Sequence, residues 1–344
     1  MNPNHERALD LFKTQLEPLR PFIEDPAVQE IMVNHARDIW IERAGVMERL
    51  DGLVIDDLRI RSAVKALATA NDKDVQVILD ARMPGYRIAA ALYPVAIKGS
   101  ALCIRKHNAS SRRLSDYLES GAFMPTAKEE HGSLGEDIQA YLAEHGEAIA
   151  KGGKALHDFL VWCVRQRKNF IVAGATGSGK TTLMNALLAE IPPNERVLTL
   201  EDTAELKVRA PNHVGLEVSE TEGVDIRRLV KLSLRFRPDR IVVGEVRGAE
   251  AYDLIDAMNT GHSGGGCTLH ADSARLALYR IENMVRMSPN ATNLPLHALR
   301  ALIAQTFDVV IYCSRLGGIR RPVEVAVVRG LRADEYDVQP VYLA

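Results

Sequence analysis

The chain has 344 residues, of which 26% are charged, and its formal net charge is −2. This length favours two domains, each with its own hydrophobic core. A net charge so close to zero excludes a global basic field that would draw the protein onto nucleic acid or an anionic membrane, so any such contact has to come from a local patch.

The four cysteines lie far apart in the sequence and form no C-x-x-C pair. This spacing argues against a zinc module or a redox motif and favours buried thiols in a reducing cytosol. The N-terminus lacks the basic and then apolar run of a signal peptide. The longest apolar stretch, 88–97, is broken by Pro94 and is too short to span a bilayer. We therefore expect a cytoplasmic protein with no transmembrane segment.

Residues 1–110 are expected to form a small α+β domain. The patterns over 5–17 and 58–70 predict helices, the first of which is ended by two prolines. Lys98-Gly99-Ser100 is a turn signal between two of the predicted strands. Short apolar runs typical of strands occur at 31–33, 39–41, 86–92 and 101–105.

Residues 111–152 are predicted to be a charged linker. The stretch 128–147 holds six acidic side chains against one lysine, and it overlaps a helix expected over 136–149. A plain charged helical face is the simpler interpretation, and an acidic docking surface is the alternative. Gly152-Gly153 marks the start of the second domain, which is expected to cover 153–344.

From residue 156 onward, predicted helices and strands alternate. Such alternation is typical of an α/β fold, in which a mostly parallel sheet is covered by helices and binds its ligands at the carboxyl ends of the strands. The predicted helices cover 156–167, 180–190 and 226–236, and the predicted strands cover 170–173, 196–200 and 241–243.

Residues 174–181 spell G-x-x-x-x-G-K-[ST] between a predicted strand and a predicted helix, which is the context of a P-loop. Backbone N–H groups of such a loop converge on phosphate oxygens, while Lys180 reaches the β- and γ-phosphates and Thr181 offers its hydroxyl to Mg²⁺. A glycine-rich surface turn is the alternative. The predicted nucleotide-binding residues are Gly174, Ala175, Thr176, Gly177, Ser178, Gly179, Lys180, Thr181 and Thr182.

Hydrolysis also needs a carboxylate that polarises the attacking water or holds the metal shell. Glu201 with Glu205 follows one predicted strand, and Glu245 follows another, where Gly244 replaces the expected strand-end Asp. A surface loop or a helix cap is the alternative for each carboxylate. His270 ends a further short apolar run, where a histidine can donate a hydrogen bond to phosphate.

Four boxes of residues occur together: 174–181, 199–202, 237–248 and 260–271. They resemble the secretion ATPases of type IV secretion and conjugation systems, the Trb-type conjugal transfer ATPases in particular, within the type II/IV secretion superfamily. The resemblance is weaker over 25–123. It implies a RecA-like P-loop ATPase domain preceded by a PAS-like domain, with ATP and Mg²⁺ as cofactors. It also implies a homo-hexamer on the cytoplasmic face of the inner membrane, in contact with inner-membrane components of the apparatus.

The resemblance implies roles for individual residues as well. The Walker B motif falls on Gly244-Glu245, so that Mg²⁺ would be held by Thr181 and Glu245, partly through water. The acidic and histidine boxes fall on Glu201, Asp202, Glu205, His262 and His270. Arg87 and Arg105 match arginines that contact the nucleotide phosphates from the N-terminal domain, with ordinary surface charges as the alternative. The predicted catalytic set is Lys180, Glu201, Glu205, Glu245, His270, Arg87 and Arg105.

Arg227, Lys231 and Arg235 recur at helical spacing and would form a basic stripe opposite an apolar face. The stripe could face solvent, line a ring pore, contact nucleic acid or pair with acids of a neighbouring subunit. No aromatic-interleaved groove accompanies it, so we expect no direct sequence-specific nucleic-acid binding. A type IV pilus retraction or assembly motor and a nucleotide-gated scaffold with little turnover remain the alternatives to a secretion motor.

Overall fold

The computed structural model describes residues 3–71, 76–107, 113–124 and 137–344. The chain divides into two compact units, Met1–Leu134 and Gly135–Ala344, and each unit has its own hydrophobic core. Residues 128–136 of the acidic stretch expected in the linker lie outside the described residues. Among the helices that are described, none is both long and apolar enough to cross a membrane.

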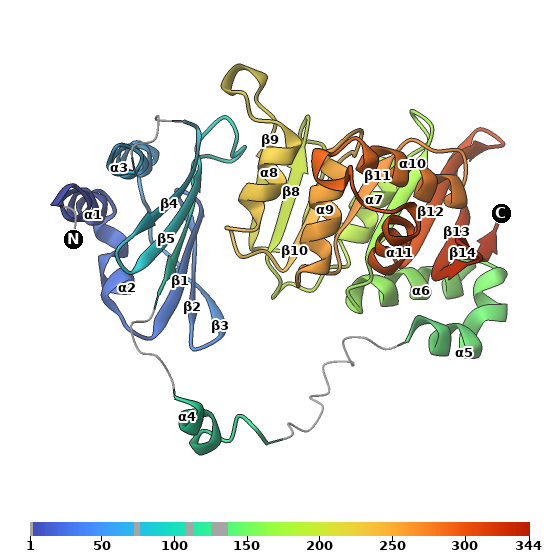
Figure 1. Ribbon diagram of the computed structural model, residues 1–344, viewed down its shortest axis with the longest axis horizontal. Helices are drawn as coiled ribbons and strands as arrows, with labels where there is room; N and C mark the ends of the chain where they lie inside the picture. Colours follow the sequence, from blue (N-terminus) through green and yellow to red (C-terminus); the bar gives the residue numbers. More distant parts are fainter. Residues whose placement is uncertain (1–2, 72–75, 108–112, 125–136) are drawn as a thin grey trace. The chain divides into compact units, whose positions relative to one another are not determined.

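The first unit contains a six-stranded antiparallel sheet with α1, α2 and α3 on one face (Figure 1). Its strands, in the spatial order β3-β2-β1-β6-β5-β4, are β1 (Val28–His35), β2 (Asp38–Arg43), β3 (Val46–Arg49), β4 (Ile78–Met83), β5 (Tyr86–Ala91) and β6 (Ala101–Lys106). Its helices are α1 (Pro3–Gln15), the short η1 (Glu17–Leu19), α2 (Arg20–Glu24), α3 (Asp57–Ala70) and α4 (Leu114–Glu119). The expected α+β organisation is confirmed.

Alternation along the strands decides which side chains meet the helices. Ile31 and Val33 of β1 and Ile39 and Ile41 of β2 all join the buried cluster that includes Phe12 of α1. Successive strand residues point to opposite faces, so a period of two brings these four branched side chains onto one face. Burial of that face against the helices stabilises the unit.

The second unit is an eight-stranded mixed sheet. In the spatial order β14-β13-β12-β7-β11-β10-β8-β9, the strands from β12 to β9 run parallel, and β13 and β14 are antiparallel additions. The strands are β7 (Phe170–Gly174), β8 (Val197–Glu201), β9 (His213–Glu217), β10 (Arg240–Val243), β11 (Gly266–Leu269), β12 (Val309–Leu316), β13 (Ile319–Arg332) and β14 (Glu335–Leu343). The mostly parallel α/β sheet expected from the alternation is confirmed.

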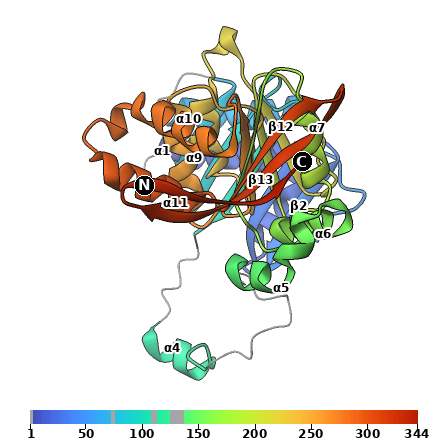
Figure 2. The same ribbon diagram turned by 90° about the vertical axis from the view of Figure 1, so that its right-hand side faces the viewer.

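Helices cover both faces of this sheet. Figure 2 shows α9, α10 and α11 on one side of the sheet and α6 and α7 on the other. The helices are α5 (Ile138–Ala150), α6 (Gly153–Arg165), α7 (Lys180–Leu188), α8 (Ile226–Ser233), α9 (Glu250–Asn259), α10 (Ala274–Arg286) and α11 (Leu296–Thr306), with short turns η2 (Glu220–Glu222) and η3 (Pro289–Ala291). Val172 of β7, Phe159 of α6 and Met184 of α7 pack in one cluster.

The helix expected within the linker, α5, belongs to the second unit by its packing. Ile138, Leu142 and Ile149 are buried in the core of that unit. Tyr141 stacks on Trp162 of α6, with ring centroids 4.4 Å apart. The charged helical face expected here therefore describes only the outer side of α5. Its inner side follows the spacing of three and four residues that an amphipathic helix needs.

All four cysteines are buried and none of them forms a disulfide, as the sequence predicted. Cys313 of β12 lies directly beside the end of β7, where it pairs with Gly174 in the ladder. Burial raises the pKa of the Cys313 thiol to about 11. The thiol therefore stays protonated at neutral pH and packs as a small apolar side chain.

Candidate functional site

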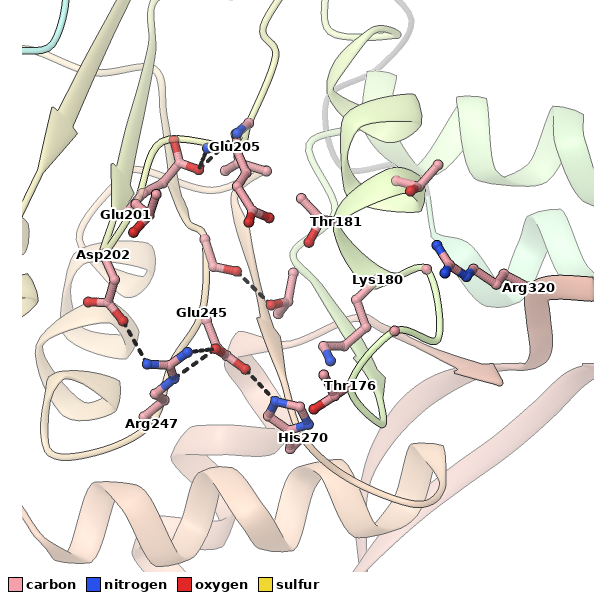
Figure 3. A pocket seen from close by; sticks show the side chains of 17 residues that line it. Thr176, Lys180, Thr181, Glu201, Asp202, Glu205, Glu245, Arg247, His270 and Arg320 are labelled. Atoms are coloured by element: carbon pink, nitrogen blue, oxygen red, sulfur yellow. Dashed lines mark hydrogen bonds and ion pairs between the residues drawn. The ribbon is translucent and has the colours of Figure 1, made fainter. Parts of the chain in front are cut away.

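A pocket of about 490 Å³ lies at the carboxyl edge of the parallel strands, between the loops that follow β7, β8, β10 and β11 (Figure 3). It brings together sequence-predicted residues from four separate segments. Those that line it are Thr176, Gly177, Gly179, Lys180, Thr181, Thr182, Glu201, Asp202, Glu205, Gly244, Glu245 and His270. Gly174, Ala175 and Ser178 complete the loop but do not line the pocket.

The loop over 174–181 is shaped by its glycines. Gly174 has a φ of +151°, and a Cβ placed there would lie 2.3 Å from the carbonyl oxygen of Cys313. Gly179, just before α7, has a φ of +98°, which other residues rarely adopt. The hydroxyl of Ser178 is buried and forms no hydrogen bond with the described residues. The turn therefore leaves a compact cradle of backbone N–H groups at a helix N-terminus, which suits a phosphate.

The ammonium group of Lys180 lies inside this cradle. It donates hydrogen bonds to the carbonyl oxygens of Gly174, at 2.9 Å, and Ala175, at 3.1 Å. Burial lowers the pKa of Lys180, and the carboxylate of Glu245 opposes that change. The ammonium group of Lys180 and the carboxylate of Glu245 are thus close enough to interact electrostatically. They lie on the two sides of the space that a terminal phosphate would take.

Glu245 is held by a histidine and an arginine. Its Oε1 lies 2.8 Å from Nε2 of His270, and its Oε2 accepts a hydrogen bond of 2.7 Å from Nε of Arg247. Arg247 also reaches Oδ2 of Asp202 at 3.0 Å, so the four residues form a chain along the pocket (Figure 3). The bond with Glu245 raises the pKa of Arg247. Glu245 is therefore oriented from both sides before any substrate arrives.

Glu201 has a different role because one of its oxygens is already used by the backbone. Its Oε1 accepts hydrogen bonds from the N–H groups of Glu205, at 2.9 Å, and Leu206, at 2.8 Å. Burial raises the pKa of Glu201, and the two amide bonds partly oppose this shift. Glu201 therefore shapes the loop that presents Glu205 to the pocket.

The packing of Glu201 also explains why Gly244 stands where a strand-end Asp was expected. A Cβ on Gly244 would lie 2.9 Å from Cγ of Glu201. Real Cβ atoms essentially never come so close to a neighbouring heavy atom, so any side chain here would displace Glu201. The carbonyl oxygen of Gly244 accepts a 2.6 Å hydrogen bond from the hydroxyl of Thr268, a pocket residue that the sequence did not single out.

Glu201→Gln is expected to make the protein less sensitive to rising pH. Because the pKa of Glu201 is raised above its ordinary value of 4.5, the folded protein binds this proton more tightly than the unfolded chain. Wild-type stability therefore falls as pH rises through the interval between the unfolded and folded pKa values, and stays lower above it. Glutamine keeps an oxygen for the two amide bonds and has no proton to lose.

The measurement is the melting temperature of both proteins at several values between about pH 5 and pH 8. The melting temperature of Glu201→Gln relative to wild type is expected to rise across this range. Glu222→Gln, on an exposed turn, is the control. A variant with the same pH slope as wild type would show that Glu201 does not titrate with folding.

The two histidines of the histidine box are not brought together. His262 precedes β11 and His270 follows it, so they lie at opposite ends of the strand. His262 contacts the carbonyl oxygen of Ala257 at 3.1 Å and does not line the pocket. Close packing explains the glycine at position 265 of the loop between them, because a Cβ there would lie 2.1 Å from the carbonyl oxygen of Ile241.

Arg87 and Arg105 lie in the first unit, directly opposite each other on β5 and β6. Arg87 binds Asp80 through two nitrogens, at 3.2 and 2.9 Å. Arg105 lies 3.5 Å from the buried carboxylate of Glu30. Cross-strand neighbours point to the same face of a sheet, so the two guanidinium groups form a basic pair held by acidic partners.

The basic stripe of α8 is partly neutralised within the chain. Asp253 of α9 accepts a hydrogen bond of 2.7 Å from Arg227 and lies 3.5 Å from Lys231. Asp253 is buried between the two helices, so these pairs join α8 to α9. Pairing within the chain was not among the roles expected for the stripe.

The pocket also contains two arginines, Arg247 and Arg320, that were not predicted to be site residues. Arg247 lies within the box 237–248, but no function was predicted for it. Its position two residues after Glu245 could have indicated that it lies near the pocket. Arg320 of β13 also lines the pocket. No motif marks it, because its position depends on the pairing of β12 with β7.

The pocket combines a phosphate cradle, which lies between a strand and a helix, with a strand-end carboxylate and a histidine on its other side. This combination defines a P-loop protein of the α/β class. The profile of the family described as "Type II/IV secretion system protein" matches residues 13–316. PtlH of Bordetella pertussis, a type IV secretion system protein, is 36% identical over 351 residues, which cover 96% of this chain and 98% of PtlH. VirB11 of Brucella suis is 36% identical over 314 residues, covering 86% of this chain and 84% of VirB11.

A solved structure gives the same result. The crystal structure of the VirB11 ATPase from the Brucella suis type IV secretion system, in complex with sulphate, matches with a TM-score of 0.83 and 32% identity, covering 94% of this chain and 96% of that one. The chain therefore belongs to the type II/IV secretion system protein family and, within it, to the VirB11/PtlH group of type IV secretion ATPases. The resemblance found in the sequence is confirmed.

Proposed function

We propose that this protein is a Mg²⁺-dependent ATPase motor of a type IV secretion or conjugative transfer apparatus and that it works as a homo-hexamer. Its place is at the cytoplasmic face of the inner membrane, in contact with the apparatus's membrane components. The names of its relatives support a role in a type IV secretion system. One observation carries the chemistry: Lys180 of the phosphate cradle and an oriented Glu245 line the same pocket.

In this proposal Lys180 binds the β- and γ-phosphates of ATP and the N–H groups of the loop bind the phosphate oxygens. The donor set fits Mg²⁺, because the hydroxyl of Thr181 and a carboxylate oxygen of Glu245 line one pocket, and this ion usually takes few protein ligands beside phosphates and water. When bound, Mg²⁺ neutralises charge that develops on the phosphate oxygens.

Glu245 is the carboxylate best placed to accept the proton of the attacking water. Arg247 and His270 hold it in one orientation, which removes a conformational cost from the reaction. Glu205 lines the same pocket and is the second candidate, whereas Glu201 is a positioning residue because its oxygen holds the loop. His270 is proposed to exchange its contact with Glu245 for a γ-phosphate oxygen and thereby report ATP.

The first unit is proposed to act as a PAS-like domain that closes over a RecA-like second unit. Arg87 and Arg105 would then supply positive charge to the phosphates. Their adjacent positions on β5 and β6 support a joint role. Charge delivered from another domain makes hydrolysis depend on closure, and this dependence is what turns ATP turnover into motion.

An equal mixture of Lys180→Ala and Arg105→Ala proteins is expected to recover ATP turnover that each variant lacks alone, if the arginine acts on a neighbouring subunit's site. In random rings about a quarter of the sites then contain both residues. Each variant's melting temperature is the control, because Arg105→Ala leaves the buried carboxylate of Glu30 without this partner. No recovery in mixed rings would assign the arginine to its own subunit.

Steady-state release of phosphate from ATP by the full chain tests the proposed function. A chain that binds ATP without turnover would instead be a nucleotide-gated scaffold. A type IV pilus retraction or assembly motor shares the chemistry and differs in its partners, so pilin genes beside the coding sequence would favour it over a secretion motor.

A further inference from the structure

We propose that Arg320 is a further nucleotide-binding residue, whose guanidinium group contacts the α- and β-phosphates of the nucleotide in the P-loop. This inference rests on the proposed function and deepens it. It starts from one observation: Arg320 lines the same pocket as Lys180 and Glu245, although it comes from β13, far along the chain from the loop.

Strand pairing carries Arg320 to the P-loop. β12 runs parallel to β7, with Cys313 opposite Gly174 at the start of the loop. The chain then turns at Gly317-Gly318, and β13 returns antiparallel, with Arg320 opposite Arg315. The first residues of β13 consequently lie beside the phosphate cradle. Strand pairing in the sheet places them there, and no local sequence motif does.

The stem of Arg320 covers Gly179 of the loop. A Cβ on Gly179 would lie 3.2 Å from Cβ and 3.8 Å from Cδ of Arg320. The aliphatic part of the side chain therefore lies close beside the P-loop backbone. Figure 3 shows Arg320 on the side of Lys180 that faces away from Glu245 and His270. Since the γ-phosphate belongs between Lys180 and Glu245, Arg320 faces the α- and β-phosphates.

The charge of Arg320 is available to a ligand. The other arginine of the pocket, Arg247, is engaged by Glu245 and Asp202. The guanidinium group of Arg320 forms no hydrogen bond or ion pair with any residue in the described part of the chain. A guanidinium group presents a planar fork of donors that matches two phosphate oxygens, and a charge-assisted bond of this kind is stronger than a neutral one.

Arg321 provides a comparison within the same strand. It has the same charge, but successive side chains of a strand point to opposite faces, and Arg321 does not line the pocket. Removing either residue changes the charge of the chain equally. If the two substitutions change nucleotide affinity by different amounts, the difference reports contact with the nucleotide and not the overall electrostatic field of the protein.

The experiment is calorimetric titration of the full chain, in the presence of Mg²⁺, with ADP and with the imido analogue of ATP. Arg320→Ala is expected to weaken both ligands by about tenfold or more and by similar factors, because the contact excludes the γ-phosphate. Arg321→Ala should stay within about twofold of wild type. Arg320→Lys should be intermediate, since it keeps the charge and loses the fork.

Turnover gives a second readout. In Arg320→Ala, KM for ATP should rise by the factor lost in binding, while kcat changes by less than about threefold. Equal affinities in Arg320→Ala and Arg321→Ala, or a loss confined to the ATP analogue, would overturn the inference. If Arg320→Ala kept its affinity for nucleotide while Lys180→Ala lost it, only the role of Arg320 would be refuted. If the wild-type chain bound neither nucleotide, the proposed function would fail as well.

Discussion

Lys180→Ala is expected to lower ATP turnover by about 10²–10³-fold or more, because the variant loses the ammonium group that lies inside the phosphate cradle. Its ammonium group would pass from the carbonyl oxygens of Gly174 and Ala175 to the β- and γ-phosphates. Alanine cannot replace this charge in the transition state. The substitution leaves the loop's glycines and the rest of α7 unchanged, so the fold and the proposed ring should persist.

The measurements are steady-state phosphate release and size-exclusion chromatography with light scattering. Lys207→Ala is a matched control, since Lys207 is exposed on a loop near the pocket and its side chain does not line it. Wild-type turnover in Lys180→Ala would refute the assignment of the P-loop. Loss of the assembled ring in this variant would show that the lysine supports subunit contacts through the nucleotide.

Glu245→Gln is expected to reduce turnover by about 10²–10³-fold while ADP binding changes by less than about threefold. Glutamine has the same shape but cannot take a proton from water. It also removes the negative charge that lies between His270 and Arg247. The variant should therefore hold ATP without hydrolysing it, and the fraction of bound nucleotide that remains ATP after incubation is the direct measurement.

Two further glutamates make this test specific. Glu205→Gln should have a smaller effect on turnover, because Glu205 lines the pocket without the contacts that orient Glu245. Glu250→Gln is the outer control: Glu250 accepts hydrogen bonds from the N–H groups of Arg247 and Gly248 and does not line the pocket. If Glu205→Gln stopped turnover and Glu245→Gln did not, the proton acceptor would be Glu205.

Much of the site could be predicted because its residues follow strand ends directly. The P-loop, Glu201, Glu245 and His270 each come within a few residues of a parallel strand, and such strands end at one edge of their sheet. The roles of the carboxylates could not be predicted in this way. The hydrogen bonds of Glu201 and the contacts of Glu245 with His270 and Arg247 depend on which groups meet across the pocket.

Other features required the packing of the whole unit. The acidic composition of the predicted linker did not indicate that one face of α5 is buried. That face packs against α6 and other parts of the core. The space behind Gly244 is taken by Glu201, from a neighbouring strand. Arg227 and Lys231, predicted as a stripe, share one acidic partner on α9.

The sequence by itself determined the alternation of helices and strands, the phosphate cradle and the family, because these depend on local chemistry: glycine conformations, a lysine at a helix start and the periods of apolar residues. Only the tertiary structure decided which carboxylate is oriented, which is committed to the backbone, and that Arg320 joins the site. These follow from contacts between residues distant in the chain, and such contacts are set by strand order and register.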